Sequence, residues 1–196
     1  KLAQAHEHFK MGRARFNRGL VEKAFEFFLR AAEIDASCFL TQYAVGSILL
    51  TGKSKDYDFI DVSNAELHFL EAARYARDAV EEVPHARDYY AKSLVAASMA
   101  CFVQAVESGS AEKARQACTL ARDVIENCPD CAEAYFLLAK VRVSFGGTNG
   151  AIELLENAVR RDRLFCLRID ADRSFDPIRD EVRALFERLR EETVGE

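Results

Sequence analysis

The chain has 196 residues, of which 49% are hydrophobic and 30% are charged, and this composition can bury one sizeable core without dividing into domains. Its formal net charge of -5 and its interspersed acidic and basic residues exclude the broad positive surface that gathers nucleic acid or anionic membrane. The longest strongly apolar run, residues 44–50, is far shorter than the roughly 20 residues of a membrane span, so we expect one soluble domain, residues 1–196.

The first segment, residues 5–38, predicts a pair of antiparallel helices. Small residues recur where two helices would touch, and Phe28 stands four residues after Ala24 to fill the gap between them. The residues at these offsets are Gly12, Phe16, Gly19, Ala24, Phe28, Ala31 and Asp35. We therefore expect two helices that approach each other closely.

The second segment, residues 39–84, keeps the same frame with a longer connection between its two helices. Gly46 lies one period after Gly12, which places it where the first helix of the new pair would be closely packed. The second helix is marked by Ala65, Phe69 and Ala72. We expect this second helix to continue to Val83, because Pro84 then stops it.

Two further pairs are expected at residues 86–129 and 132–163. In the earlier pair, Ser110 suits the N-cap of the second helix, and Glu112 puts a negative charge in its first turn, where the helix dipole favours one. The later pair repeats the scheme of residues 5–38 with Tyr135, Leu138, Ala139, Gly146, Ala151, Leu155, Ala158 and Asp162. The sequence thus predicts four helix pairs in succession.

The last segment, residues 164–192, predicts a capping helix. Asp176 and Pro177 form a good helix start. One apolar stripe follows at Ile178, Val182, Leu185, Phe186 and Leu189. Such a helix covers the apolar face that the last pair of a repeat array would otherwise leave in water.

The pairs across residues 5–162 resemble the tetratricopeptide repeat (TPR), a helix-turn-helix unit of about 34 residues with small and aromatic residues at these offsets. The resemblance is loosest in the two central pairs, which are longer than this unit. It implies an all-α fold, a TPR-like α-solenoid in which antiparallel helix pairs form a right-handed superhelix, followed by the C-terminal capping helix.

The stretch "GSILLTGKS", residues 46–54, is similar to a phosphate-binding loop, but its spacing and context argue against one. Such a loop needs four residues between its first glycine and the Gly-Lys pair, a strand before it and a helix after it. Here five residues intervene, and the stretch closes a repeat helix. We interpret Gly52 as a left-handed C-cap and Lys53 as a cation near the helix's negative end.

Cys128 and Cys131 form a Cys-x-x-Cys pair whose two interpretations are a turn between repeats and a redox-sensitive disulfide. A structural zinc site needs four ligands, and no second such pair is present, so we expect no metal and no cofactor. The four histidines and the paired carboxylates form no recognisable catalytic set, and we expect that the chain is not an enzyme.

The resemblance implies that the first helix of each pair lines a concave groove that binds a peptide. In matched register the inward residues are Phe9, Arg13, Phe16, Asn17, Tyr43, Ser47, Leu50, Tyr90, Leu94, Ala97, Phe136, Lys140 and Val143. Aromatic anchors with a few cations suit a peptide that carries apolar side chains and acidic groups. For each residue the alternative is packing between helices.

Some members of the family clamp the carboxylate terminus of chaperone tails with lysines and asparagines on successive first helices. Here Phe9 stands at one clamp lysine, Arg13 at its asparagine partner and Ala44 at the next asparagine. The sequence therefore disfavours a chaperone-tail ligand.

The polar connection at residues 51–64 interrupts a compact repeat with residues that the fold does not require. We interpret Lys53, Lys55, Tyr57 and Phe59 as an accessory contact surface. A linker is the alternative interpretation of this loop.

The leading hypothesis is a protein-interaction module whose concave groove binds a peptide or a partner domain, as part of a larger protein. The alternative is a structural spacer or a homo-oligomerisation unit, and a nucleotide- or metal-dependent enzyme is disfavoured. Six cysteines without a disulfide framework are typical of a reducing compartment, so we expect a cytoplasmic protein. Because no initiator methionine precedes Lys1, we expect a trimmed N-terminus, which leaves open whether a targeting segment once preceded it.

Overall fold

A computed structural model describes residues 1–52 and 58–194 of the chain. The described elements are α1 (Leu2–Phe16), α2 (Val21–Ile34), α3 (Phe39–Thr51), α4 (Val62–Asp78), α5 (Ala86–Ser108), α6 (Ala111–Asn127), α7 (Ala132–Ser144), α8 (Ala151–Arg161), α9 (Phe165–Ala171), the 3-10 helix η1 (Arg173–Ile178) and α10 (Arg179–Val194). No β-strand occurs in the two described ranges.

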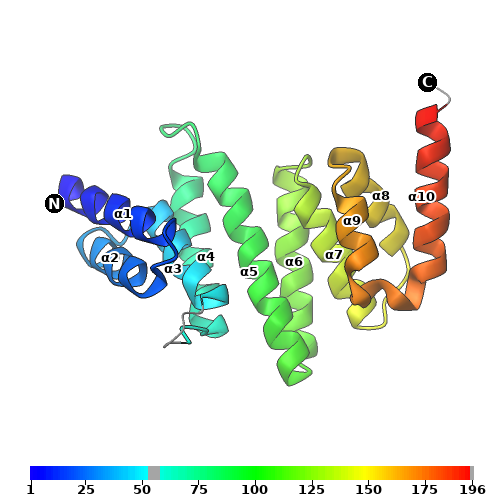
Figure 1. Cartoon of the computed structure of the whole chain (residues 1–196), viewed down its shortest axis with the longest axis horizontal. Helices are drawn as coiled ribbons and strands as arrows, with labels where there is room; N and C mark the ends of the chain where they lie inside the picture. Colours follow the sequence, from blue (N-terminus) through cyan, green and yellow to red (C-terminus); the bar gives the residue numbers. More distant parts are fainter. Residues whose placement is uncertain (53–57, 195–196) are drawn as a thin grey trace.

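The helices succeed one another along a single array, with the N-terminus at one end and the C-terminus at the other (Figure 1). Each helix from α1 to α8 packs against the next one in the chain. The first helices α3, α5 and α7 also contact one another across neighbouring pairs. This nearest-neighbour packing is the architecture of a solenoid.

Glycine and phenylalanine set the close approach within the two N-terminal pairs. A Cβ atom at Gly12 would lie 2.6 Å from the Phe28 ring, and one at Gly46 would lie 2.9 Å from the Phe69 ring. In the fourth pair, buried Ala139 and Leu155 occupy the matched positions. A larger residue on α7 is thus accompanied by a smaller one on α8, which keeps the interhelix volume filled.

Side-chain caps begin the second helices of the two central pairs. The Ser110 hydroxyl accepts a hydrogen bond from the backbone N–H of Lys113 at 3.3 Å, as its position in the sequence predicted. The Asp61 carboxylate accepts one from the backbone N–H of Asn64 at 3.0 Å. Each bond satisfies one of the N–H groups that a helix start leaves without a partner.

Gly52 ends α3, but not in the left-handed conformation that the sequence indicated. Its φ is -74° and its ψ is 112°, which is extended backbone. A Cβ atom at Gly52 would lie 2.5 Å from the carbonyl oxygen of Ile48, so close approach to the preceding turn is what requires glycine there. The prediction of a left-handed cap was therefore wrong.

The second helix of the second pair is shorter than expected. It ends at Asp78, and residues 79–82 form turns. Glu81 and Glu82 would place negative charge at the negative end of a longer helix, and Pro84 disfavours helical backbone in the residue before it. Both effects favour an earlier end than the predicted one at Val83.

The predicted capping helix is divided into three elements. The chain turns through α9 and η1 before α10 begins at Arg179, so Pro177 lies inside the 3-10 helix rather than at the start of a long one. The apolar stripe is present as predicted. Ile178, Val182 and Leu185 are buried, and Phe186 and Leu189 pack against the same cluster.

A buried carboxylate joins the middle of the array. Glu66 on α4, only 5% exposed, accepts hydrogen bonds from Lys113 Nζ and Gln104 Nε2 on Oε2, each at 2.6 Å. Gln116 Nε2 donates to its other oxygen at 2.9 Å. Burial raises the pKa of this carboxyl, but the hydrogen bonds from Lys113 and Gln104 place it below its usual range. Burial and this neighbouring carboxylate raise the pKa of the Cys101 thiol to about 12. These hydrogen bonds to Glu66 therefore join α4, α5 and α6 in the interior of the array.

None of the helices in the described ranges combines the length and apolar character needed to cross a membrane.

Candidate functional site

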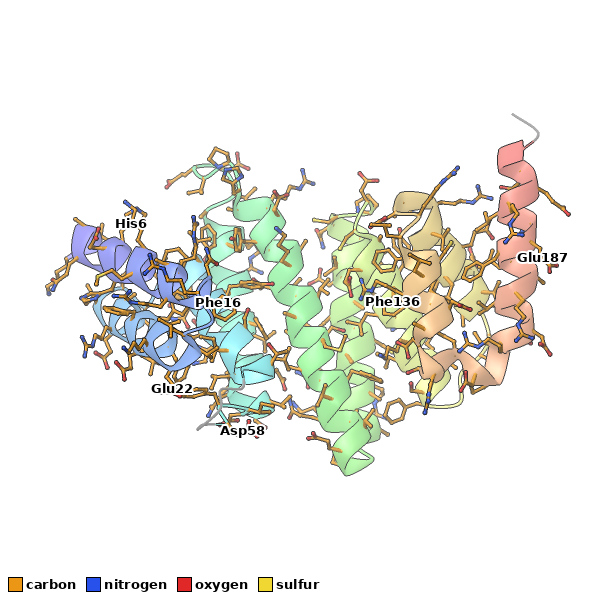
Figure 2. The ribbon with its side chains drawn as sticks, in the orientation of Figure 1. His6, Phe16, Glu22, Asp58, Phe136 and Glu187 are labelled. Carbon is orange, nitrogen blue, oxygen red and sulfur yellow. The ribbon has the colours of Figure 1, made fainter. Side chains whose placement is uncertain are left out.

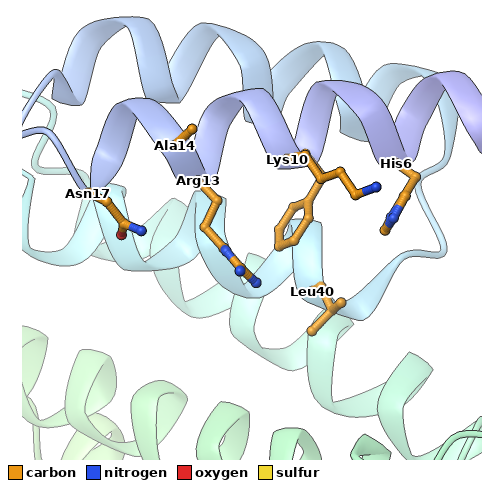
Figure 3. A pocket seen from close by; sticks show the side chains of 7 residues that line it. His6, Lys10, Arg13, Ala14, Asn17 and Leu40 are labelled. Atoms are coloured by element: carbon orange, nitrogen blue, oxygen red, sulfur yellow. The ribbon is translucent and has the colours of Figure 1, made fainter.

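A pocket of about 460 Å³ opens on α1 at the N-terminal end of the array (Figure 3). It is lined by His6, Phe9, Lys10, Arg13, Ala14, Asn17 and Leu40. We call this set the α1 pocket. Three residues that the sequence placed in the groove, Phe9, Arg13 and Asn17, are brought together in it.

Helical spacing explains why one face of α1 supplies most of the α1 pocket. Residues three and four apart lie side by side on a helix, so His6, Phe9, Lys10, Arg13 and Asn17 form one stripe. The Phe9 ring packs on the Phe28 ring of α2 with 5.6 Å between their centroids. The apolar wall of the pocket is therefore held in place by the core of the first pair.

The charged groups of the α1 pocket are basic. Lys10 and Arg13 are exposed, and no acidic residue lines the pocket. Within residues 1–52 and 58–194, neither side chain has a hydrogen-bonded or ion-paired partner among the described contacts. Two unpaired cations beside Phe9 and Leu40 favour a ligand that combines negative charge with an apolar group.

On α3 the predicted residues pack toward the interior of the array. The Tyr43 ring lies 5.5 Å from the Phe69 ring and 5.6 Å from the Tyr89 ring, measured between centroids. Burial and the neighbouring Tyr89 raise the pKa of Tyr43. The Ser47 hydroxyl donates to the backbone carbonyl of Tyr43 at 2.8 Å. Tyr43 and Ser47 are half-buried and do not line the α1 pocket.

On α5 the residue that faces Tyr43 is Tyr89, one position before the predicted Tyr90. Tyr90 turns toward α6, where its hydroxyl donates to Asp123 Oδ2 at 3.3 Å. Leu94 is 5% exposed and packs with Ala73 and other core residues. Leu94 is therefore an interior residue, and the predicted role as a binding residue does not fit its burial.

On α7 the predicted pair is covered by the chain itself. Phe136 is 3% exposed and packs on Phe165 and Phe175, with ring centroids 5.5 and 5.6 Å away. Lys140 Nζ donates to Asp172 Oδ2 at 2.8 Å. Figure 2 shows Phe136 among the C-terminal helices, far along the array from His6. The α9–η1 segment thus occupies the place where a ligand was expected.

Phe16, at the end of α1, has 46% of its surface exposed (Figure 2). Residues that pack between helices are buried, as Phe28 is at 3%, so Phe16 is open to a partner although it does not line the α1 pocket. Leu50, in contrast, packs partly buried beside Phe69 and Ala97.

Four residues of the α1 pocket were missed by the sequence analysis: His6, Lys10, Ala14 and Leu40. The signal for the first three was present, because each lies three or four residues from Phe9, Arg13 or Asn17. Leu40 comes from the start of α3, and its place in the pocket depends on how two pairs stack. That stacking leaves no local mark in the sequence.

The accessory loop is described only in part. Lys53, Lys55 and Tyr57 lie outside the described residues. Phe59 packs its ring on Phe25 of α2, with 5.1 Å between the centroids. Phe59 therefore contributes to the packing of the first pair, and a contact role for the loop stays a prediction.

The six cysteines are free thiols. Cys131 N–H donates to the Cys128 carbonyl at 3.0 Å, so the Cys-x-x-Cys stretch is a turn between α6 and α7. Burial raises the pKa of the Cys131 thiol, which makes its reactive thiolate scarcer. Among the residues that the structure describes, no group of three or more His, Cys, Asp or Glu is placed to hold a metal ion.

Across the described residues, each helix pair packs against the next along one array, which defines a TPR-like α-solenoid, and a solved structure has a similar fold. The crystal structure of MamA is similar over 94% of this chain and 95% of that one, with a TM-score of 0.65 and 16% sequence identity. The predicted all-α solenoid fold is therefore confirmed.

The crystal structure of YrrB, a TPR protein with an unusual peptide-binding site, matches over 82% of this chain and 89% of that one, with a TM-score of 0.32 and 17% identity. No protein-family profile and no curated protein matches the sequence.

Proposed function

We propose that this chain is a protein-interaction module that binds a peptide segment of a partner protein in the α1 pocket. The observation that carries the proposal is the pairing of an apolar floor, made by Phe9 and Leu40, with the unpaired cations Lys10 and Arg13. A pocket of about 460 Å³ can accommodate one or two side chains of a peptide. In this proposal residues 1–196 form one domain that binds and does not catalyse.

The chemistry of the lining residues defines the peptide. An acidic side chain or a terminal carboxylate can pair with the Arg13 guanidinium, which offers several donors in one plane. The Asn17 amide can donate to or accept from the peptide backbone. An apolar side chain beside the acidic one can displace water from Phe9 and Leu40. The proposed ligand is therefore an acidic peptide with an apolar anchor.

Peptide selection from a random library on the intact chain tests this proposal. Selected peptides should combine an acidic and an apolar residue, and Arg13→Glu should weaken their binding roughly tenfold or more, because the charge at the pocket is reversed. The control is Arg122→Glu, which reverses the charge of an exposed arginine on α6 and should leave binding unchanged. Peptides whose binding is insensitive to Arg13→Glu would contradict the proposal.

A spacer or oligomerisation role makes a different prediction for the same samples. If the chain served only self-association, light scattering would show an oligomer at micromolar concentration and the library would yield no peptide that depends on Arg13. We expect selected peptides together with a scattering mass that does not change when Arg13 is replaced.

A further inference from the structure

The fourth helix pair has an aromatic and a basic residue at the positions that Phe9 and Arg13 hold in the α1 pocket. Phe136 and Lys140 stand on α7 at the same repeat positions as Phe9 and Arg13 on α1, and each cation lies one helical turn after its aromatic residue. The two sites therefore present a ring and a positive charge with the same spacing along a first helix.

The α7 site is occupied by the chain's own Asp172 and Phe175. The Asp172 carboxylate binds Lys140 Nζ at 2.8 Å, and the ring centroid of Phe175 lies 5.6 Å from that of Phe136. Phe175 is completely buried. Burial raises the pKa of Asp172, but the hydrogen bond from Lys140 holds it below its usual range, so the carboxylate is bound in its charged form.

The backbone conformation of this occupant explains how one short segment reaches both side chains. Asp172 is the N-cap of η1, and Phe175 lies within its first turn. The Asp172 carboxylate also accepts a hydrogen bond from the backbone N–H of Ser174 at 2.9 Å. The backbone N–H of Phe175 donates to the carbonyl of Asp172 at 3.2 Å, and this bond between residues three apart closes a turn of the 3-10 type. A single 3-10 turn therefore points an acidic and an aromatic side chain at the same surface.

The α1 site has no such occupant among the described residues. Where α9 ends after seven residues and η1 folds back over α7, α3 continues as a regular helix from Phe39 to Thr51, with only Leu40 bordering the pocket. Phe9 is half-buried rather than covered, and Arg13 is exposed. The ring and the cation that α7 uses internally are thus available on α1.

We infer that the α1 pocket binds a partner segment in which an acidic residue is followed three residues later by an aromatic one, presented on a 3-10 turn. This inference rests on the proposed function and specifies its ligand. The acidic side chain binds Arg13, and the aromatic ring packs on Phe9, as Asp172 and Phe175 do on Lys140 and Phe136.

Lys10 distinguishes the two sites and extends the inference. The matched position on α7 is Leu137, which is completely buried, whereas Lys10 is exposed and lines the α1 pocket. The α1 pocket therefore offers a second cation. A partner segment with a further acidic residue next to the first should bind more tightly than one without it.

The test uses a peptide with the sequence of residues 170–179, DADRSFDPIR, acetylated and amidated, titrated into the intact chain by calorimetry. We expect binding that Arg13→Glu weakens roughly tenfold or more. The D172N and F175A versions of the peptide should each lose a similar factor, because each removes one of the two anchors. Two protein controls, Lys140→Gln and Arg122→Glu, should bind the unaltered peptide as the wild type does.

If the peptide binds, two results would overturn the inference. One is binding that is equal for the peptide, its D172N version and its F175A version. The other is binding abolished by Lys140→Gln and kept by Arg13→Glu, which would mean that the peptide displaces the internal segment on α7. Absence of binding by DADRSFDPIR also rejects the inferred motif. The proposed function fails as well only when the random library yields no peptide that depends on Arg13.

Discussion

The first and fourth helix pairs both carry an aromatic residue and a cation at equivalent first-helix positions, but the two positions are open on α1 and covered on α7. On α7, Phe136 and Lys140 are covered by α9 and η1, whereas on α1 the matched Phe9 and Arg13 line an open pocket. The difference lies in the next element of the chain, which is a regular helix after the first pair and a short helix with a 3-10 turn after the fourth. A repeat position thus fixes where a side chain stands, and the next element decides whether a partner can reach it.

The largest effect is expected from Phe175→Ala, which empties the covered site. Loss of a completely buried ring should lower the free energy of unfolding by about 3–5 kcal/mol, because contacts are lost and a cavity remains. The matched control is Phe16→Ala at the end of α1, where 46% of the residue surface is exposed and a loss of about 1 kcal/mol or less is expected. Urea unfolding followed by circular dichroism measures the free energy of unfolding of both variants. Equal losses in the two variants would contradict the difference between the covered and the open site.

The second prediction exchanges the interhelix packing of the two pairs. Gly12→Ala places a methyl group 2.6 Å from the Phe28 ring and should cost about 1–3 kcal/mol through overpacking. Adding Phe28→Leu gives the first pair the same combination as Ala139 and Leu155 in the fourth pair. The double variant should therefore lose less free energy of unfolding than the sum of the losses in the two single variants. If the changes in the free energy of unfolding for Gly12→Ala and Phe28→Leu simply add in the double variant, the volumes of these two side chains do not compensate each other.

The third prediction concerns the ion pair of the covered site. Lys140→Ala should lower the free energy of unfolding by about 1 kcal/mol, because Asp172 loses its partner in a partly buried position. The pKa of Asp172 is lowered by folding, so its stabilisation is complete above its unfolded pKa of about 3.9 and is lost as the pH falls through the lowered folded value.

The difference in unfolding free energy between the wild type and Lys140→Ala should accordingly be constant near neutral pH and shrink in acid. Urea titrations at a series of pH values measure it. A difference that grows below about pH 4 would contradict the assignment of the bond to the ionised carboxylate.

The smallest stability effect is expected at the open site. Arg13→Ala should change the free energy of unfolding by less than about 0.5 kcal/mol, because no described contact pairs its guanidinium with an acid. The same change should weaken binding of acidic peptides. If Arg13→Ala lowers the melting temperature as far as Lys140→Ala does, Arg13 has a structural partner. That result would contradict the difference between the open α1 site and the covered α7 site.

The sequence predicted the fold well because helix pairing depends on local periodicity. Gly12, Phe28, Gly46 and Phe69 marked the close contacts, and the structure has them within the predicted pairs. The cap at Ser110 depends on residues three apart, and it too was predictable. Such features need no knowledge of distant parts of the chain.

The site was predictable only in part, because burial depends on elements far apart in the sequence. Phe136 and Phe9 hold equivalent positions in the repeat. The residues around them do not indicate that η1 will cover Phe136 and leave Phe9 open. On α5, Tyr89 rather than the predicted Tyr90 lies opposite Tyr43, and Tyr90 is bonded to Asp123 on α6. Long-range stacking, rather than propensity, decided these outcomes.

We expect a partner peptide to bind in the α1 pocket and not at the α7 site. An amide NMR titration of the labelled chain with DADRSFDPIR tests it most directly, because the shifts report the location of binding residue by residue. We expect shifts concentrated at residues 6–17 and at Leu40, with residues 136–140 and 172–178 unmoved. Shifts concentrated at residues 136–140 and 172–178, with α1 unmoved, would contradict it.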